Sequence, residues 1–215
     1  MNKDFKRDIQ TETKTFLING KKKDINLFHY KTIHTSDEIN SLLNQTKNIF
    51  LSSDYHINKP SRIKDGIKNI ILSKHNKVVG KDDVFIFLGD LLNHEFDIKL
   101  EEVNDFISNL NGRKIMVLGN NDEYQTQTYL DMGFEFVVTN FKYNDMIFTH
   151  SPIDTDCINF HGHIHASRNY FNIEYRNHID VYVDDHMFTP LNIKKIDKDK
   201  YKSISTYDID YKHIK

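Results

Sequence analysis

Val84-Phe85-Ile86-Phe87-Leu88-Gly89-Asp90 is an apolar run of strand length that stops at a glycine and an aspartate. Continuous apolar character predicts a strand buried on both faces, because a strand with one exposed face alternates apolar and polar residues. Three further runs have the same form, and each stops at a polar residue able to bind a metal ion: Asn48–Ser52 before Asp54, Lys114–Leu118 before Gly119-Asn120, and Met146–Thr149 before His150. The repetition of this pattern indicates the fold.

Segments with helical spacing lie between the apolar runs. Arg62–Asn76 and Lys99–Asn111 each carry apolar residues on one helical face. Asp122–Met132 is predicted as a third helix, and an N-cap signal at Thr35-Ser36-Asp37-Glu38 predicts a fourth. Strands that alternate with helices indicate an α/β domain. In such sheets ligands bind beyond the carboxyl ends of the strands, where the polar residues lie.

The two ends of the chain are predicted to differ from its middle. Residues 1–25 are polar and charged, which predicts an N-terminal arm or an edge hairpin, and residues 191–215 are predicted as a charged C-terminal tail. Further strands are predicted at 26–33, 170–175 and 178–183. We find no linker or internal repeat, so a single domain over residues 1–215 is expected at this length.

The composition excludes several classes of protein. The chain is 38% hydrophobic and 28% charged, as soluble globular proteins are, and its net charge of −2 predicts no broad surface for nucleic acid or an anionic membrane. The single cysteine, Cys157, excludes an intramolecular disulfide. Neither a signal peptide nor a membrane span is evident. We therefore expect a cytoplasmic protein. The Lys-, Asn- and Ile-rich composition is typical of low-GC bacteria and their phages, so the expected compartment is the cytoplasm of a bacterium or of a phage-infected host cell.

Phe160-His161-Gly162-His163-Ile164-His165 holds three imidazoles within five residues. Side chains two apart point the same way in an extended chain, so His163 and His165, or all three histidines, could face one pocket. Neutral imidazole is the commonest metal ligand, although a histidine-rich turn without metal is the alternative. The ligand-capable residues that follow the four apolar runs favour a metal site.

Five motifs, in this order, resemble those of the calcineurin-like metallophosphoesterase superfamily. They are Asp54-Tyr55-His56, Gly89-Asp90, Gly119-Asn120, Thr149-His150 and Gly162-His163-Ile164-His165. The resemblance extends from about Asn48 to His165, with a fainter match through 179–190. It implies a four-layer α/β fold, in which a sandwich of two β-sheets is flanked by helices and two metal ions lie at the strand ends.

The resemblance also implies a set of ligands for each ion. The first metal would take Asp54, His56, Asp90 and His165, and the second would take Asp90, Asn120, His150 and His163. Mixed imidazole and carboxylate ligands suit Mn, Fe, Zn or Ni better than Mg or Ca. We therefore expect Mn²⁺ first, with Fe, Zn, Ni or Mg as alternatives. Two carboxylates against two divalent ions leave a formal charge of about +2, which favours a phosphate ligand and a bridging hydroxide as nucleophile.

The chain departs from the family pattern after Asn120. Family members usually have a histidine there that is taken to assist the leaving group, whereas this chain has Asn121, which donates a hydrogen bond but transfers no proton. Either the leaving group needs little protonation or another group supplies the proton, and His94 is the candidate, with a surface-loop histidine as the alternative. Asp122 is expected to orient a ligand by a hydrogen bond.

The expected function is hydrolysis of phosphate esters, as a phosphodiesterase or a phosphatase, with nucleotides among the candidate substrates. Two alternatives stay open. A nuclease would have the same centre, but the charge of −2 and the lack of a basic aromatic stripe count against nucleic acid. A non-catalytic scaffold would be expected to lack some ligands. Membranes are not expected as partners, and the oligomeric state is not predicted.

Overall fold

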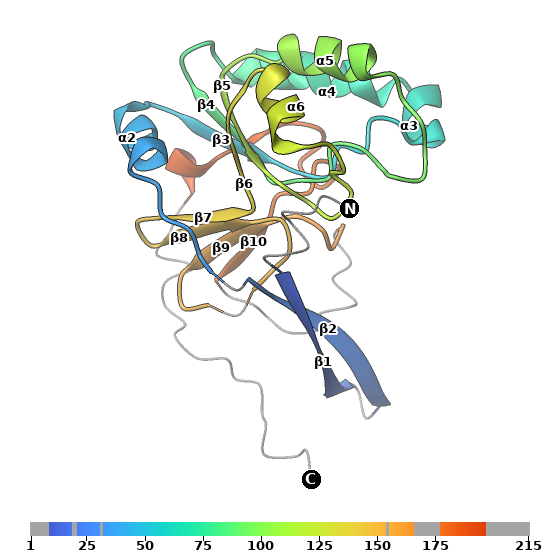
Figure 1. The fold of residues 1–215 in the computed structure, drawn as a ribbon, viewed down its shortest axis with the longest axis vertical. Helices are drawn as coiled ribbons and strands as arrows, with labels where there is room; N and C mark the ends of the chain where they lie inside the picture. Colours follow the sequence, from blue (N-terminus) through green and yellow to red (C-terminus); the bar gives the residue numbers. More distant parts are fainter. Residues whose placement is uncertain (1–8, 19–20, 31, 154, 166–176, 197–215) are drawn as a thin grey trace.

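The larger of two main sheets holds three of the four apolar runs (Figure 1). A computed structural model describes residues 9–18, 21–30, 32–153, 155–165 and 177–196. The strand order is β11-β3-β4-β5-β6, with bounds β3 Ile49–Ser52, β4 Val84–Phe87, β5 Arg113–Val117, β6 Phe134–Val138 and β11 Leu191–Asn192. Strands β3 to β6 run parallel and β11 runs antiparallel to β3. The carboxyl ends of β3, β4 and β5 therefore lie at one edge of the sheet.

The fourth apolar run lies in the smaller sheet, whose order is β10-β9-β8-β7. Its strands are β7 (Asn140–Tyr143), β8 (Met146–Thr149), β9 (Ile158–His161) and β10 (His178–Asp180). The β7–β8 pair is antiparallel, while β8, β9 and β10 are parallel to one another. The histidine cluster thus follows a strand of one sheet, and the Asp54 and Asp90 motifs follow strands of the other.

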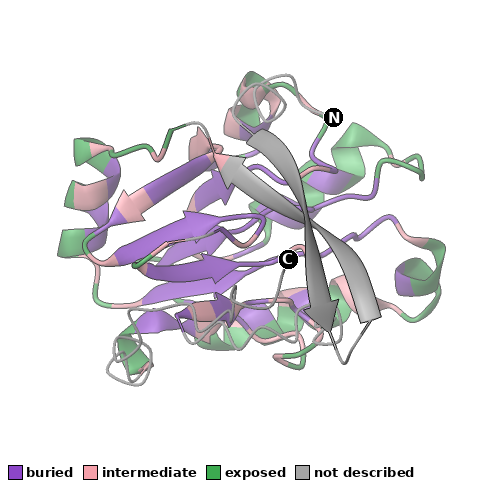
Figure 2. Cartoon of the chain, turned by 90° about the horizontal axis from the view of Figure 1, so that it is seen from below, coloured by how far each residue is buried: buried purple, intermediate pink, exposed green. Residues whose placement is uncertain are grey.

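Two cores explain why the apolar runs are continuous. In β4, Phe85 and Phe87 pack into a cluster with residues of the helices, whereas Val84 and Ile86 pack into a cluster with residues of the smaller sheet. In the second cluster the ring of Phe148 stacks on that of Phe160, with centroids 5.4 Å apart. Figure 2 shows most of the strand residues of both sheets as buried. The predicted α/β fold, with two sheets and flanking helices, is confirmed.

Helices form in all four regions where the sequence predicts them, but two of the predicted helices have different bounds in the structure. They are α2 (Asp37–Gln45), α3 (Pro60–Lys64), α4 (Ile67–Val78), α5 (Leu100–Ser108) and α6 (Thr126–Asp131). Ser36 caps α2 by accepting a hydrogen bond from the Ile39 N–H, at 3.2 Å. Within the described ranges, no helix has the length and apolar character that crossing a membrane requires.

Two helical predictions need correction. The predicted helix over Arg62–Asn76 is two helices, because Gly66 adopts a left-handed φ of 64° between them. The predicted helix over Asp122–Met132 forms only from Thr126 to Asp131. Its first residues form a loop instead, because the Asp122 carboxylate accepts backbone hydrogen bonds from the ends of two strands.

The N-terminal end forms a hairpin, one of the two alternatives predicted for it, and the C-terminal end contains a strand that was not predicted. Strands β1 (Ile9–Ile18) and β2 (Lys21–Tyr30) form an antiparallel hairpin that extends away from the two sheets in Figure 1. The predicted tail begins with β11 and a short 3-10 helix, Ile193–Lys195. The strand predicted over 178–183 is β10 plus an isolated bridge between Tyr182 and Ser53. The strand predicted at 170–175 lies outside the described residues.

The stability of the fold should fall on acidification because of His75. This α4 residue is fully buried, its Nε2 lies 2.9 Å from the carbonyl oxygen of Asn111, and its Nδ1 has no partner. Burial lowers the pKa of His75 to about 4. The unfolded chain therefore binds the proton more readily, and the free energy of unfolding should fall by about 3 kcal/mol between pH 6.5 and pH 4.

The measurement is chemical denaturation across that pH range, without metal, for wild type, His75→Gln and His34→Gln. His75→Gln should remove most of the contribution of His75 to the pH slope, since glutamine does not titrate. The exposed His34 provides the matched control and should leave the slope unchanged. Equal slopes for all three proteins would contradict the burial of a neutral imidazole at position 75.

Candidate metal centre

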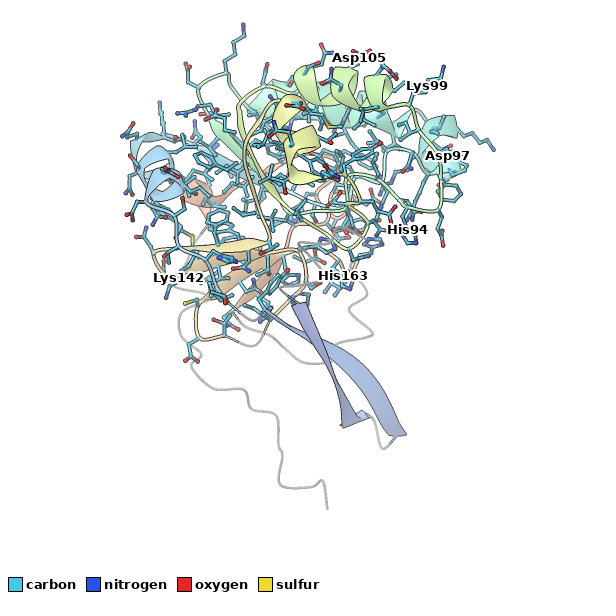
Figure 3. The ribbon with its side chains drawn as sticks, viewed as in Figure 1. His94, Asp97, Lys99, Asp105, Lys142 and His163 are labelled. Atoms are coloured by element: carbon cyan, nitrogen blue, oxygen red, sulfur yellow. The ribbon has the colours of Figure 1, made fainter. Side chains whose placement is uncertain are left out.

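The polar residues at the strand ends converge between the two sheets. Backbone hydrogen bonds hold the loops together: Asp54 N–H donates to the Gly89 carbonyl at 2.9 Å, and His56 N–H donates to the Asp90 carbonyl at 3.1 Å. The Gly162 N–H donates to the His150 carbonyl at 2.9 Å, joining the two motifs of the smaller sheet. Figure 3 shows His163 and His94 on the same side of the molecule. The loops thus bring together the residues that were predicted as ligands.

Asp54, His56, Asp90 and His165 form one group that could hold a metal ion. Each offers a ligand atom, and these atoms all lie within 4.8 Å of one another. His165 Nε2 lies 3.0 Å from Asp54 Oδ1 and 3.1 Å from His56 Nε2. His56 Nε2 lies 3.7 Å from Asp90 Oδ2. These are the four residues predicted for the first metal.

A second group surrounds the Nε2 atom of His150. That atom lies 3.0 Å from Asn120 Oδ1, 3.2 Å from His163 Nδ1 and 3.4 Å from Asp90 Oδ1. These are the four residues predicted for the second metal. The two oxygens of Asp90 face different groups, Oδ2 toward His56 and Oδ1 toward His150. Asp90 is therefore placed between the two groups.

The donor atoms fit cations. Nδ1 of His56 lies 2.9 Å from the Leu92 carbonyl, and Nδ1 of His150 lies 2.8 Å from the Leu88 carbonyl. A carbonyl oxygen accepts hydrogen bonds and does not donate them, so the ring proton of each histidine is assigned to its Nδ1. The Nε2 lone pair of each histidine then faces its group of possible ligands. At His150 this lone pair meets the oxygens of Asn120 and Asp90, which are also electron-pair donors. A divalent cation would satisfy such a set of donors.

The backbone at the site is held in an uncommon conformation. Five of the seven predicted ligands have left-handed φ values: Asp54 58°, His56 42°, Asp90 60°, His163 70° and His165 46°. Side chains disfavour this region, and residues forced into it gather at functional sites. The hydrogen bonds between the loops hold the ligands in this conformation.

Glycines allow the loops to approach one another. A Cβ on Gly89 would lie 2.6 Å from His150 Nδ1, and a Cβ on Gly119 would lie 2.3 Å from Asp90 Oδ1. Gly162 has no left-handed φ, but it lies directly against Asp54.

The pKa values of the site residues depend on burial and on the charges of neighbouring side chains. Burial opposes ionisation of Asp54, but the hydrogen bond from His165 and the nearby His150 hold the pKa of Asp54 well below its usual value. Burial likewise opposes protonation of His150, yet the carboxylates of Asp90 and Asp54 raise its pKa. Burial lowers the pKa of His56 and of His163 to about 4. These two imidazoles are neutral at pH 7, as metal ligands must be.

Asp122 lies behind the site and orients its backbone. Its carboxylate accepts hydrogen bonds from the N–H groups of Asp90 at 2.8 Å, Leu91 at 3.1 Å and Gly119 at 2.7 Å. Burial and the nearby Asp90 charge raise the pKa of Asp122 to about 7. Asp122 was expected to orient a ligand by a hydrogen bond, and it accepts that bond from the backbone N–H of Asp90.

The structure brings together the two residues considered for proton transfer. Asn121 Nδ2 donates to Asp90 Oδ2 at 2.6 Å, and the Asn121 N–H donates to Asp90 Oδ1 at 2.9 Å. On its other side, Asn121 Oδ1 is hydrogen-bonded to Nδ1 of His94. His94 lies on an exposed loop but is joined to the site through Asn121.

Sequence reasoning missed a partly buried network that contacts His165. The Tyr182 ring stacks on the His165 ring, with centroids 4.8 Å apart and an interplanar angle of 11°. The Tyr182 hydroxyl is hydrogen-bonded to Asp184, and Arg62 forms an ion pair with Asp184 at 2.9 Å. Arg62 and Asp184 are 122 residues apart, and neither belongs to a motif. His161 lies outside both groups, with Nδ1 against the Gly162 carbonyl at 3.0 Å.

Comparison with known proteins finds a sequence relative and solved structures that are similar to this chain. An uncharacterised protein of Methanocaldococcus jannaschii, MJ1445, is 27% identical over 150 residues, which span 63% of this chain and 74% of the relative. A protein of unknown function from Aquifex aeolicus, AQ665, has a similar fold, with a TM-score of 0.53 and 23% identity over 70% of this chain and 98% of its own. The nuclease MPE of Pseudomonas putida aligns at a TM-score of 0.44 and 17% identity over 72% and 74% of the two chains.

A family model provides the broadest match. The model of the calcineurin-like phosphoesterases matches residues 30–209, which include every predicted ligand and the network around Arg62. The motifs, the two sheets and the group of possible metal ligands agree with this match. The chain therefore belongs to the calcineurin-like phosphoesterase family and is a metal-dependent hydrolase of phosphate esters.

Proposed function

We propose that the chain is a phosphodiesterase that uses two divalent metal ions, with Mn²⁺ preferred. The observation that supports this most directly is the placement of Asp90, whose two oxygens face two separate groups of ligand atoms. When bound, two such ions would supply an activated water and positive charge for the phosphoryl oxygens. The mixed carboxylate, amide and imidazole donors favour Mn²⁺, with Fe, Zn, Ni or Mg as alternatives.

The side chains beside the site give the leaving group a source of protons. His94 donates from Nδ1 to the Asn121 oxygen, so the transferable proton is the second proton of the imidazolium form, which Nε2 carries. Asn121 is in turn held by Asp90 through two hydrogen bonds. In this proposal Asn121 orients His94, and His94 protonates the departing alcohol. The departing alcohol of a phosphate ester needs this proton because an alkoxide is a poor leaving group.

The proposal is tested with purified protein, Mn²⁺, and a matched chromogenic diester and monoester. We expect close to two metal ions per chain and faster turnover of the diester. Protein that binds metal but hydrolyses neither substrate would contradict catalysis and would indicate a scaffold. Turnover limited to oligonucleotides, with a steep salt dependence, would indicate a nuclease instead.

The roles of His94 and Asn121 predict a dependence on the leaving group. His94→Gln should lower the rate about 10²-fold on diesters with alkyl leaving groups and have little effect on nitrophenyl diesters, which leave without a proton. Asn121→His should raise the rate most on the alkyl diesters, because it adds a second proton donor. Rates are measured over leaving groups of graded pKa, with His34→Gln as the control. Equal effects on all leaving groups would contradict proton transfer.

A further inference from the structure

A cavity of about 150 Å³ lies beside the candidate metal centre. Its walls come from the loops that follow β3, β4 and β5, at the carboxyl edge of the larger sheet, where such sheets bind ligands. The lining residues are Asn58, Leu92, Asn93, His94, Phe96, Asp97, Ile98, Asn121, Glu123 and Tyr124. We call this space the side pocket.

Two contacts connect the side pocket to the candidate ligands. Leu92, in its wall, supplies the carbonyl that lies 2.9 Å from Nδ1 of His56. Asn121, also in its wall, donates to Asp90 Oδ2 at 2.6 Å. The proposed acid His94 belongs to the same wall. A phosphate at the metal centre would therefore have its leaving group beside His94, at the entrance of the side pocket.

The wall formed by residues 93–96 is ordered by one buried amide. Asn58 is 2% exposed, and its Nδ2 donates to the carbonyls of Asn93 and Phe96 while its Oδ1 accepts from the Asn93 N–H at 2.7 Å. The loop is thus held in one conformation before any substrate binds, which reduces the entropy cost of binding.

The side chains of the side pocket favour an aromatic, uncharged ligand. Phe96 is 36% exposed and shares the lining with Tyr124, and exposed aromatic rings are surfaces on which nucleobases stack. The charged groups of the lining are the carboxylates of Asp97 and Glu123, and no lysine or arginine is among its described residues. Carboxylates accept hydrogen bonds from N–H and O–H groups and repel anions.

We propose that the side pocket binds the leaving group of the diester and that this group is a nucleoside. A nucleoside is neutral, has a planar face for stacking and carries amino and hydroxyl donors for the carboxylates. Water adds across the scissile P–O bond: the phosphorus gains the hydroxyl, the bond from phosphorus to the nucleoside oxygen breaks, and that oxygen takes the proton from His94. The proton that the attacking water loses passes through solvent and restores His94. This inference rests on the proposed phosphodiesterase function. An anionic leaving group, such as a sugar phosphate or a longer strand, is disfavoured by Asp97 and Glu123.

The test compares two diesters that differ in the leaving group alone. Deoxyadenosine 5′-(methyl phosphate) carries a nucleoside that can leave as deoxyadenosine, whereas dimethyl phosphate can release only methanol. We expect kcat/KM to be about 10- to 100-fold higher for the first, as stacking of one base would give. Phe96→Ala should reduce this ratio to near one, and Phe96→Tyr should retain it. Leu100→Ala is the control, since Leu100 is 45% exposed and lies outside the side pocket.

Binding of deoxyadenosine to the protein is measured separately by equilibrium dialysis. Binding of deoxyadenosine that weakens at least tenfold in Phe96→Ala, but not in Leu100→Ala, supports the side-pocket proposal. This holds even if neither diester is hydrolysed, and in that case only the phosphodiesterase proposal fails. Equal hydrolysis of the two diesters, with nucleoside binding absent or unaffected by Phe96→Ala, overturns the side-pocket proposal and leaves the phosphodiesterase proposal intact.

Discussion

Asp90→Asn should lower phosphoesterase activity by at least about 10²–10³-fold, the size of effect seen when one group that stabilises charge in a transition state is removed. The two Asp90 oxygens are the ligand atoms that the two groups share. The asparagine amide would replace one Asp90 carboxylate oxygen with an N–H₂ donor. That donor would face either a histidine lone pair or the side-chain amide of Asn121. Bound metal should fall below one ion per chain.

The same change should not destabilise the metal-free protein. Asp90 and the buried Asp122 repel each other, and this repulsion helps to raise the pKa of Asp122 to about 7. Removing the charge of Asp90 relieves the repulsion, so metal-free Asp90→Asn should melt at the same temperature as wild type or higher. Activity, metal content and thermal unfolding in a chelator are the three measurements.

Asp105→Asn is the matched control for Asp90→Asn. Asp105 is exposed on α5, and Figure 3 shows it at the end of the molecule away from His163. It should retain wild-type activity and metal content. A protein with Asp90→Asn that keeps two ions and full activity would show that Asp90 does not join the two groups.

Gly162→Ala should destabilise the fold by about 1–3 kcal/mol, as overpacking of a closely packed site does. A Cβ at this position would lie 2.2 Å from Asp54 Oδ2 and 2.3 Å from Ser53 Oγ, which is too close for real atoms. The loop carrying His163 and His165 must then move away from Asp54. Because a displacement of about 1 Å can cost about 10²-fold in rate, activity should fall even where the protein remains folded.

Gly80→Ala provides the comparison for Gly162→Ala. Gly80 is exposed and has no left-handed φ, and a Cβ there would lie 3.2 Å from a carboxylate oxygen of Asp83, a much looser contact than either of those at Gly162. Urea denaturation and turnover with saturating Mn²⁺ are measured for both variants. Loss of activity in Gly162→Ala that excess metal restores completely would place the defect in metal affinity; no loss at all would contradict the close approach of the two loops.

The strand ends and the residues able to bind a metal ion were predictable because each is a local property of the sequence. A continuous apolar run such as Val84–Leu88 predicts a strand with two buried faces, and the structure confirms it. The polar residue after each run then lies at a strand end, wherever the strand itself is placed. The family followed from the order of the five motifs, and the family model confirms it.

The tertiary structure decided how these strand ends meet. The sequence does not show that Met146–Thr149 belongs to a different sheet from Val84–Phe87, because pairing depends on contacts between distant segments. The sequence also does not show that the residues around Asp122 form a loop and not a helical turn. They do so because the Asp122 carboxylate accepts hydrogen bonds from three backbone N–H groups, which outweighs a weak helical propensity.

The contacts that define the chemistry of the site are likewise long-range. Arg62 meets Asp184, Asn121 meets His94, and the side pocket forms from three loops that the sequence keeps apart. The sequence by itself determined which residue types follow the strands, because hydrophobic pattern and ligand type can be read from neighbouring residues. The family resemblance implied which of these residues gather around each metal. Only the tertiary structure showed the further contacts of Arg62 and His94, because contacts between distant residues depend on how the two sheets and their loops pack.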